Sequence, residues 1–301
     1  MRSPDRRSLL PLAALLLGGC AAEFTPASVV EDLRVLAMVA EPPELRLSAA
    51  AGGNELLTLR VTAVAPPLTP GGPPVTPDPA DVRWTFCPFS VGASSGYACA
   101  IPACETVLVP DATGSSVSFT PLDRLWACLA SVGGSLPGAP SGTGPPAQVE
   151  VLVRYVATLG GLRREAVQRI PVWTRAPPAT QERNLNPIIS GLSVGAGCTG
   201  GSSGCAVASV PLAVTIDPAS FQPYPAGDRT VLETVVVSFF TTAGRFTYDR
   251  GQATSGAAQT GTTLEAKELG AAREAWVWAV ARDLRGGEAV AGPVKVVFSV
   301  P

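Results

Sequence analysis

The chain of 301 residues is 46% hydrophobic and only 15% charged, so it has enough apolar side chains to fold and is not a disordered tail. Its formal net charge of −2, without a long basic run, argues against nucleic acid as a partner, because nucleic-acid recognition needs a concentrated positive surface. The sequence contains no histidine, which removes the commonest general base and the commonest metal ligand.

The first residues have the pattern of an export signal. Arg2, Arg6 and Arg7 give a positive start. The apolar run from Leu9 to Leu17 is too short for a permanent membrane span, which needs about 20 apolar residues, but it has the length of a signal-peptide core. We therefore expect an exported protein whose residues 1–19 are a signal peptide.

The apolar run ends in Leu17-Gly18-Gly19-Cys20. This tetrapeptide resembles the bacterial lipoprotein signal, in which a Leu, two small residues and a Cys are recognised by the lipid-transferring and cleaving enzymes. The resemblance implies a lipoprotein of the cell envelope, with Cys20 as its acylated, palmitate-bearing first residue and two or three lipid chains in the membrane. Ala21, where an Asp would indicate inner-membrane retention, favours the outer membrane. The alternative is an ordinary cleaved signal with Cys20 as an incidental thiol.

After a short tether at residues 20–28, the chain alternates apolar and polar residues with the period of β-strands. Strands are expected at residues 33–39, 56–65 and 82–87, and Pro42-Pro43 ends the first of them. The sets of side chains expected to share a face are Leu33, Val35, Ala37 and Val39; Leu57, Leu59, Val61 and Ala63; and Trp84 with Phe86.

The segment between Cys87 and Cys128 is rich in Gly and Ser, with short apolar pieces at 106–109 and 115–120 and an expected helical turn at 123–130. A hairpin is expected next, at 149–157 and 162–173, because Gly160-Gly161 supplies the positive φ values that a tight turn requires. Residues 29–174 are thus predicted to form a β-sandwich domain with a disulfide-bearing insertion.

Residues 175–187, which include Pro177-Pro178, are the expected linker to a second domain at 188–301. Strands are predicted there at 188–194, 207–216, 233–241, 275–281 and 294–300, with a long loop at 250–263. Val235, Val237 and Phe239 are expected to share a face. In the next strand, Trp276, Trp278 and Val280 are expected to face away from Val277 and Ala279.

The predicted fold is therefore all-β, with two tandem antiparallel β-sandwich domains. The arrangement resembles the tandem immunoglobulin-like or polycystic-kidney-type sandwiches of bacterial envelope proteins. Most of the resemblance lies in residues 188–301, which have a Trp-bearing penultimate strand and a final alternating strand. The turn between those strands contains Arg282, Asp283, Arg285, Gly286 and Gly287. This half departs from the immunoglobulin pattern because it lacks a Cys…Trp…Cys framework.

Two segments, 92–96 and 191–195, match G-x-S-x-G, the nucleophile elbow of the α/β-hydrolases. That chemistry needs a histidine to accept the serine proton and a strand-turn-helix context to expose the serine. The chain offers neither, so we interpret both matches as accidents of a Gly- and Ser-rich sequence.

Six of the seven cysteines remain once Cys20 is assigned to lipid, an even number in a compartment that permits disulfides. Cys198 and Cys205 close a small loop and are expected to pair. Three pairings are open to the other four, and we favour Cys87–Cys128 with Cys99–Cys104. A zinc site made by these four thiolates lacks the expected close Cys pairs, so we predict no metal and no cofactor.

Acidic and aromatic residues could form three other kinds of site: a glycosidase carboxylate pair, a calcium site or a sugar-stacking site. A glycosidase-type carboxylate pair stays open, because sequence spacing does not fix distances in a β-sandwich. Asp78 with Asp81, or Asp283 with Glu288, could bind calcium, but no run matches an EF-hand loop and these acids are expected to be solvated. The tryptophans that could stack on a sugar if exposed, but that alternation places in the core, are Trp84, Trp173, Trp276 and Trp278.

These patterns predict a lipid-anchored cell-envelope protein that is not an enzyme and acts as a binding, adhesion or scaffold module. Its expected contacts are the membrane, through the lipid anchor, and an envelope protein or a glycan. The alternatives are a carbohydrate-active hydrolase that uses paired carboxylates and an accessory subunit of an envelope secretion or motility complex.

Overall fold

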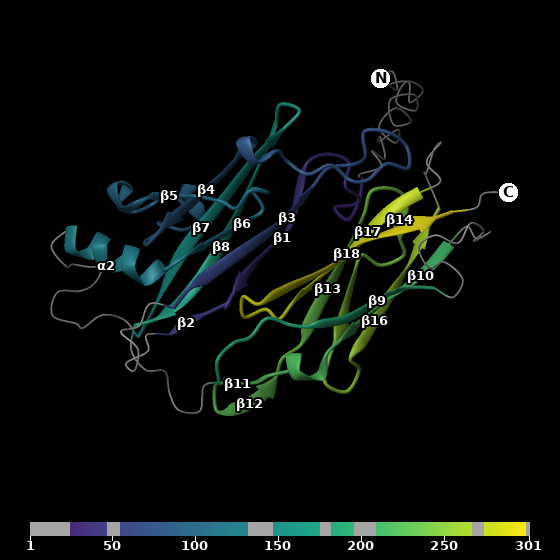
Figure 1. The fold of residues 1–301 in the computed structure, drawn as a ribbon. Coiled ribbons are helices and arrows are strands. Elements are labelled where there is room, and N and C mark those ends of the chain that lie inside the picture. The colour runs from purple at the N-terminus through teal and green to yellow at the C-terminus, as the bar shows by residue number, and fades with distance from the viewer. Residues whose placement is uncertain are drawn as a thin grey trace, which may run out of the picture.

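The computed structural model describes residues 25–46, 55–131, 147–174, 182–195, 209–266 and 274–298. Within these ranges the chain forms two β-sandwiches in opposite halves of the molecule (Figure 1). The predicted signal peptide, Cys20 and the expected Cys198–Cys205 pair lie outside the described residues. None of the helices in the described ranges is long and apolar enough to cross a bilayer.

The first sandwich packs a three-stranded sheet against a five-stranded sheet. The smaller sheet has the order β1 (Arg34–Glu41), β3 (Leu57–Val64) and β6 (Ser116–Phe119). The larger has the order β2 (Leu45–Arg46), β8 (Leu162–Trp173), β7 (Gln148–Leu159), β4 (Val82–Cys87) and β5 (Thr106–Leu108). All neighbouring strands run antiparallel except β2 and β8.

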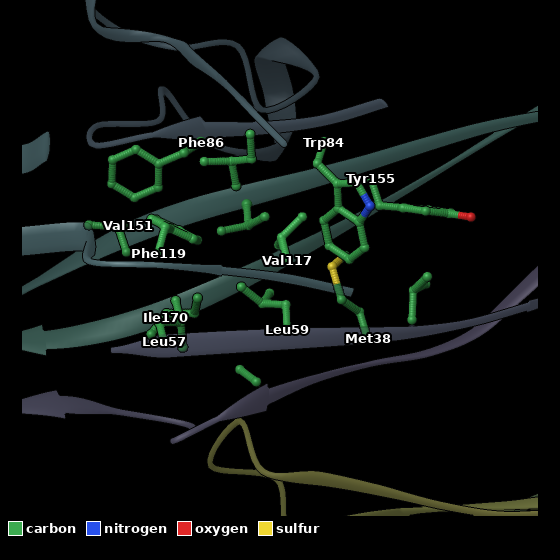
Figure 2. Close-up of a cluster of buried hydrophobic side chains, with 14 of the residues drawn as sticks. Met38, Leu57, Leu59, Trp84, Phe86, Val117, Phe119, Val151, Tyr155 and Ile170 are labelled. Carbon is green, nitrogen blue, oxygen red and sulfur yellow. The ribbon is translucent and has the colours of Figure 1, made fainter. Parts of the chain in front are cut away.

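The core between these two sheets follows the predicted alternation in β3 and β4. The side chains of Leu57 and Leu59 are fully buried, as are those of Trp84 and Phe86 from the opposite sheet (Figure 2). The Trp84 ring meets Tyr155 edge-on, with 4.9 Å between ring centroids. The β7–β8 hairpin closes at Gly160-Gly161, where both φ values are positive, as the sequence predicts.

Strand β1 corrects one sequence prediction. Its pairing with β3 shifts register between Val35 and Ala37, which indicates a β-bulge. Beyond the bulge the faces exchange, so Met38 and Ala40 enter the first core while Ala37 leaves it. The predicted single face of Leu33, Val35, Ala37 and Val39 is therefore wrong, because a strict period of two cannot anticipate an extra residue.

The insertion between β4 and β7 contains α2 (Pro121–Ser131) and two one-turn 3-10 helices, Ala93–Ser95 and Pro102–Cys104. A third 3-10 helix, Pro79–Asp81, lies directly before β4. The structure pairs Cys87 with Cys99 and Cys104 with Cys128. The favoured pairing of Cys87 with Cys128 and Cys99 with Cys104 is therefore wrong. The reason is local: residues 89–100 fold back on the end of β4, where Ala100 N–H donates to Phe89 O at 2.6 Å.

The second sandwich packs two four-stranded sheets. One has the order β14 (Arg245–Phe246), β16 (Gln259–Glu265), β10 (Ser209–Ile216) and β9 (Ile189–Val194). The other has the order β15 (Arg250–Ala253), β13 (Val235–Thr241), β17 (Glu274–Arg282) and β18 (Glu288–Val297). A separate hairpin joins β11 (Pro223–Ala226) to β12 (Arg229–Leu232), and a 3-10 turn occupies Pro218–Ser220.

The core of the second sandwich confirms the predicted faces of β13 and β17. Val235, Val237 and Phe239 are buried together, and Val277 and Ala279 join them from β17. The predicted long loop at 250–263 is wrong, because β15 and β16 occupy much of it. Their Gly, Ala and Thr content concealed two strands whose stability comes from pairing with β13 and β10.

Candidate functional site

The two sandwiches meet through a buried apolar interface. Leu36, Ala37 and Val64 present the outer face of the β1–β3 sheet. Trp278 and Val280 pack against them from β17, and all five side chains are at most 5% exposed. Because β1 and β17 each bury both faces, the junction is built like a third core rather than a flexible contact.

Polar groups at this interface are paired across it. Arg282 donates to Leu36 O at 2.9 Å and forms an ion pair with Glu288. The other carboxylate oxygen of Glu288 accepts from Met38 N–H at 2.9 Å. These bonds tie backbone groups of β1, the edge strand of its sheet, to the second sandwich, so they favour one relative orientation of the sandwiches.

The predicted tether at 20–28 is docked at its described end. Val30 N–H donates to Thr241 O at 2.8 Å, and Thr241 N–H donates to Ser28 O at 2.9 Å. Ser28 and Val30 are at most 3% exposed. The chain therefore enters the fold at the junction, alongside the end of β13.

The described end of the predicted linker, residues 182–187, is bound to both halves. Asn186 donates to Ala40 O and to the Glu41 carboxylate, both at 2.7 Å, and accepts from Glu288 N–H at 3.0 Å. One residue earlier in the chain, Leu185 N–H donates to the Gln222 side chain at 2.8 Å. This end of the linker therefore connects the two sandwiches by hydrogen bonds.

A groove of about 510 Å³ opens beside the junction. Its walls are β3, the proline-rich loop after β3, and the β17–β18 hairpin. The side chains and backbone that line it are Val61, Thr62, Ala63, Val64, Pro73, Pro74, Thr76, Pro77, Val82, Thr113, Gly114, Ser115, Tyr155, Trp276, Trp278, Gly292 and Pro293. We call this the junction groove; it combines apolar and aromatic walls with a few hydroxyl groups, as ligand sites commonly do.

Trp276 is the half-buried aromatic residue of the junction groove. Its indole N–H donates to Gly72 O at 2.7 Å, which fixes the proline-rich loop against β17. The ammonium group of Lys295 lies 5.9 Å from the ring centroid. Trp276 therefore has one tethered edge and one face shared with a cation, while the three other predicted tryptophans, Trp84, Trp173 and Trp278, are buried as expected.

Among the described residues, no ionised side chain lines the junction groove. Burial raises the pKa of Tyr155 to about 12, so its phenol stays neutral at physiological pH. The remaining lining residues are apolar or carry hydroxyl groups. The groove can therefore bind a ligand by apolar contact, ring stacking and hydrogen bonds, but its walls offer no carboxylate pair for general acid–base catalysis.

A second, more polar pocket of about 580 Å³ lies between the sandwiches, with Glu41, Arg60 and Glu288 in its lining. Both oxygens of Glu288 are engaged by Arg282 and Met38. Glu41 accepts from Asn186. The two carboxylates are therefore used to hold the junction together.

The other candidate residues that the sequence offered lie in turns or in a strand. Ser94, in the first G-x-S-x-G match, lies in the exposed 3-10 turn Ala93–Ser95, and Ser193, in the second, donates from β9 to Ala213 O at 3.3 Å. Asp78 caps a 3-10 turn by accepting from Ala80 N–H at 2.9 Å. Asp283, predicted to be solvated, is instead 3% exposed, and its burial has no signal in the sequence beyond the turn that follows β17.

Comparisons with known proteins show only loose likeness. No protein-family model matches the chain, and no curated protein matches it. Among solved structures, the D0-D1 domains of intimin are 14% identical with a TM-score of 0.24, and the alignment covers 87% of this chain and 98% of that one. A Ca²⁺-stabilized adhesin with which an Antarctic bacterium binds ice is 11% identical with a TM-score of 0.23, covering 90% and 49%. The all-β sandwich architecture confirms the predicted fold class and rests on the sheets described above.

Proposed function

We propose that the chain is a lipid-anchored protein of the cell envelope, at the outer membrane, whose two sandwiches act as one rigid binding, adhesion or scaffold module. The junction groove is the proposed contact site, and an envelope protein or a glycan is the proposed partner. The observation that supports a binding role most strongly is the chemistry of this groove. It has Tyr155, Trp276 and Trp278 in its walls, and none of its described lining residues is ionised.

The buried junction supports the scaffold part of the proposal. A module that presents a binding surface at a fixed distance from a membrane needs its parts held in one orientation. The apolar contacts of Trp278 with β1, and the bonds of Asn186 to both halves, provide such a constraint.

The entry point of the chain supports a membrane-proximal position for the junction. If Cys20 is acylated, seven residues lie between it and Ser28, which is docked beside β13. A fully extended segment of that length spans at most about 30 Å. The junction would then lie within that distance of the lipid surface.

The hydrolase alternative receives no support from the described pockets. The described residues that line the junction groove include no carboxylate, and Glu288 of the second pocket is held by Arg282 and Met38. Glu233 and Asp283 are near one another but at most 3% exposed, and they line neither of these two pockets. We therefore do not propose catalysis.

The proposal can be tested by crosslinking in cells, followed by mass spectrometry of proteins that copurify with the membrane-bound chain. Cys20→Ser is the unanchored control. The expected result is recovery of the wild-type chain in the outer membrane, enrichment of one envelope protein or glycan, and loss of both in the control.

Each other outcome of this experiment bears on the proposal. A fixed, stoichiometric partner identifies the accessory-subunit form of the scaffold. Membrane recovery that is unchanged by Cys20→Ser contradicts the lipid anchor. In a separate assay, turnover of a glycan panel that is lost on substitution of a single acidic residue would contradict the non-enzymatic role.

A further inference from the structure

A cluster of buried polar side chains lies where the linker meets the second sandwich. Asn184 comes from the linker, Glu233 follows β12, and Asp283 begins the turn after β17. Their side chains are only 2–3% exposed. We call these three residues the polar cluster.

The hydrogen-bond partners within the polar cluster are incomplete. Asp283 Oδ1 accepts from Arg285 N–H at 2.7 Å and Gly287 N–H at 2.9 Å, and Glu233 Oε1 accepts from the Arg285 guanidinium. The second oxygen of each carboxylate, and both polar atoms of the Asn184 amide, have no hydrogen-bond partner among the described residues. Buried polar atoms without a partner are rare in folded proteins and indicate a missing ligand or water.

One of the unpartnered atoms, Asp283 Oδ2, lies close to a backbone carbonyl. A Cβ placed on Gly287 would be 2.2 Å from Asp283 Oδ2 and 3.1 Å from Leu185 O, so these two oxygens flank one point. Only glycine at position 287 leaves that space open. The Asn184 amide also lies near the Asp283 carboxylate, outside hydrogen-bond geometry but close enough to influence its ionisation.

The charges in the polar cluster do not balance. The two carboxylates face one cation, the guanidinium of Arg285, which stacks over Tyr224 with 5.3 Å to the ring centroid. One guanidinium therefore serves two buried carboxylates, and a second positive charge at this position would offset the remaining negative charge.

We propose that the polar cluster binds a calcium ion. The ligands are Asp283 Oδ2, Glu233 Oε2, Asn184 Oδ1 and the carbonyl oxygen of Leu185. Calcium prefers this mixture of carboxylate, amide and carbonyl oxygens, and it tolerates irregular geometry with water completing the shell.

The proposed ion would strengthen the junction. Asn184 and Leu185 supply ligands, while the neighbouring residues Arg183 and Asn186 contact the first sandwich. An ion bound between these positions and the β17–β18 turn would fix the linker to the second sandwich. This inference is independent of the lipid anchor and of the junction groove.

Calcium titration of the full chain, purified in detergent, tests the proposal. Unfolding temperature is measured in chelator and in millimolar Ca²⁺, and heat of binding is measured with Ca²⁺ alone. The variants are Asp283→Asn and Glu233→Gln, which keep side-chain shape. The matched control is Asp228→Asn, whose carboxylate is 95% exposed in the β11–β12 turn.

The expected result is a rise of several degrees in unfolding temperature on adding Ca²⁺ to the wild type and to the Asp228→Asn control, because a ligand that binds only the folded state stabilises it. The rise should be lost in both cluster variants, each of which gives an independent answer if the other does not fold. No rise in the wild type, or an equal rise in all four proteins, would overturn the proposal and leave water or a proton as the missing partner.

Discussion

Trp278 offers the sharpest test of the buried junction. Its side chain is 1% exposed and points from β17 toward Leu36, Ala37 and Val64, away from the core of its own sandwich. Replacement by Ala should therefore weaken the contact between the sandwiches while leaving both sandwich cores intact. Trp126 on α2, which is 46% exposed, provides a matched control.

The magnitude follows from burial. A buried aromatic side chain removes about 150–250 Å² from water, which at about 25 cal/mol per Å² stabilises the fold by about 4–6 kcal/mol. Part of that area stays buried in the Ala variant, and observed Trp→Ala losses in cores are about 3–5 kcal/mol. We therefore expect Trp278→Ala to lose about 3–5 kcal/mol and Trp126→Ala to lose about 1 kcal/mol or less.

Denaturant unfolding combined with small-angle X-ray scattering measures both effects. The wild type should unfold in one transition with a compact scattering profile. Trp278→Ala should lower the midpoint and either separate the transition into two steps or increase the radius of gyration. A loss no larger than that of Trp126→Ala, with unchanged scattering, would refute the view that this junction couples the sandwiches.

Three further predictions concern single features of the fold. In chelator, the free energy of unfolding should fall as pH rises from about 4 toward neutrality, because burial raises the pKa of Asp283 above its unfolded value and ionisation then opposes folding. Asp283→Asn should flatten this pH dependence in a series of denaturant titrations, and an unchanged slope would contradict the prediction. Removal of the Cys104–Cys128 disulfide by a double Cys→Ser change should cost about 3 kcal/mol, since the cysteines are 24 residues apart, and calorimetry showing no loss would count against this pairing. Gly292→Ala should destabilise by more than about 1 kcal/mol, because φ is +108° and a Cβ would lie 2.6 Å from a carbonyl oxygen of β17, whereas Gly256→Ala, with open space and no positive φ, should change stability by less than about 1 kcal/mol; equal effects of the two would refute the strain argument.

Strands with one buried face could be predicted from the sequence. In β3, β4 and β13 the alternation of apolar and polar residues matches one strand face that packs into a core. Leu57, Trp84 and Val237 therefore lie where the pattern places them. The prediction for β1 was wrong because the second face of this strand packs against the other sandwich and a bulge changes its register. Residue patterns within one strand contain no information about a partner that lies some 240 residues away.

Segments defined by long-range pairing also escaped prediction. Strands β15 and β16 have small, polar sequences and exist because β13 and β10 offer them hydrogen-bond partners. The disulfide pairing depended on how residues 89–100 fold back, which cysteine spacing does not encode. The polar cluster was missed for the same reason, since Asn184, Glu233 and Asp283 come from three separate segments.

The most direct test of the proposed binding role is site-specific photo-crosslinking in cells from inside the junction groove. A photoreactive amino acid replaces Thr76, an exposed residue of the groove lining, or Thr230, an exposed residue of β12 that lies outside it. We expect a discrete crosslinked product from position 76 that is absent from position 230. No product from position 76, or the same products from both positions, would contradict the assignment of this groove as the binding surface.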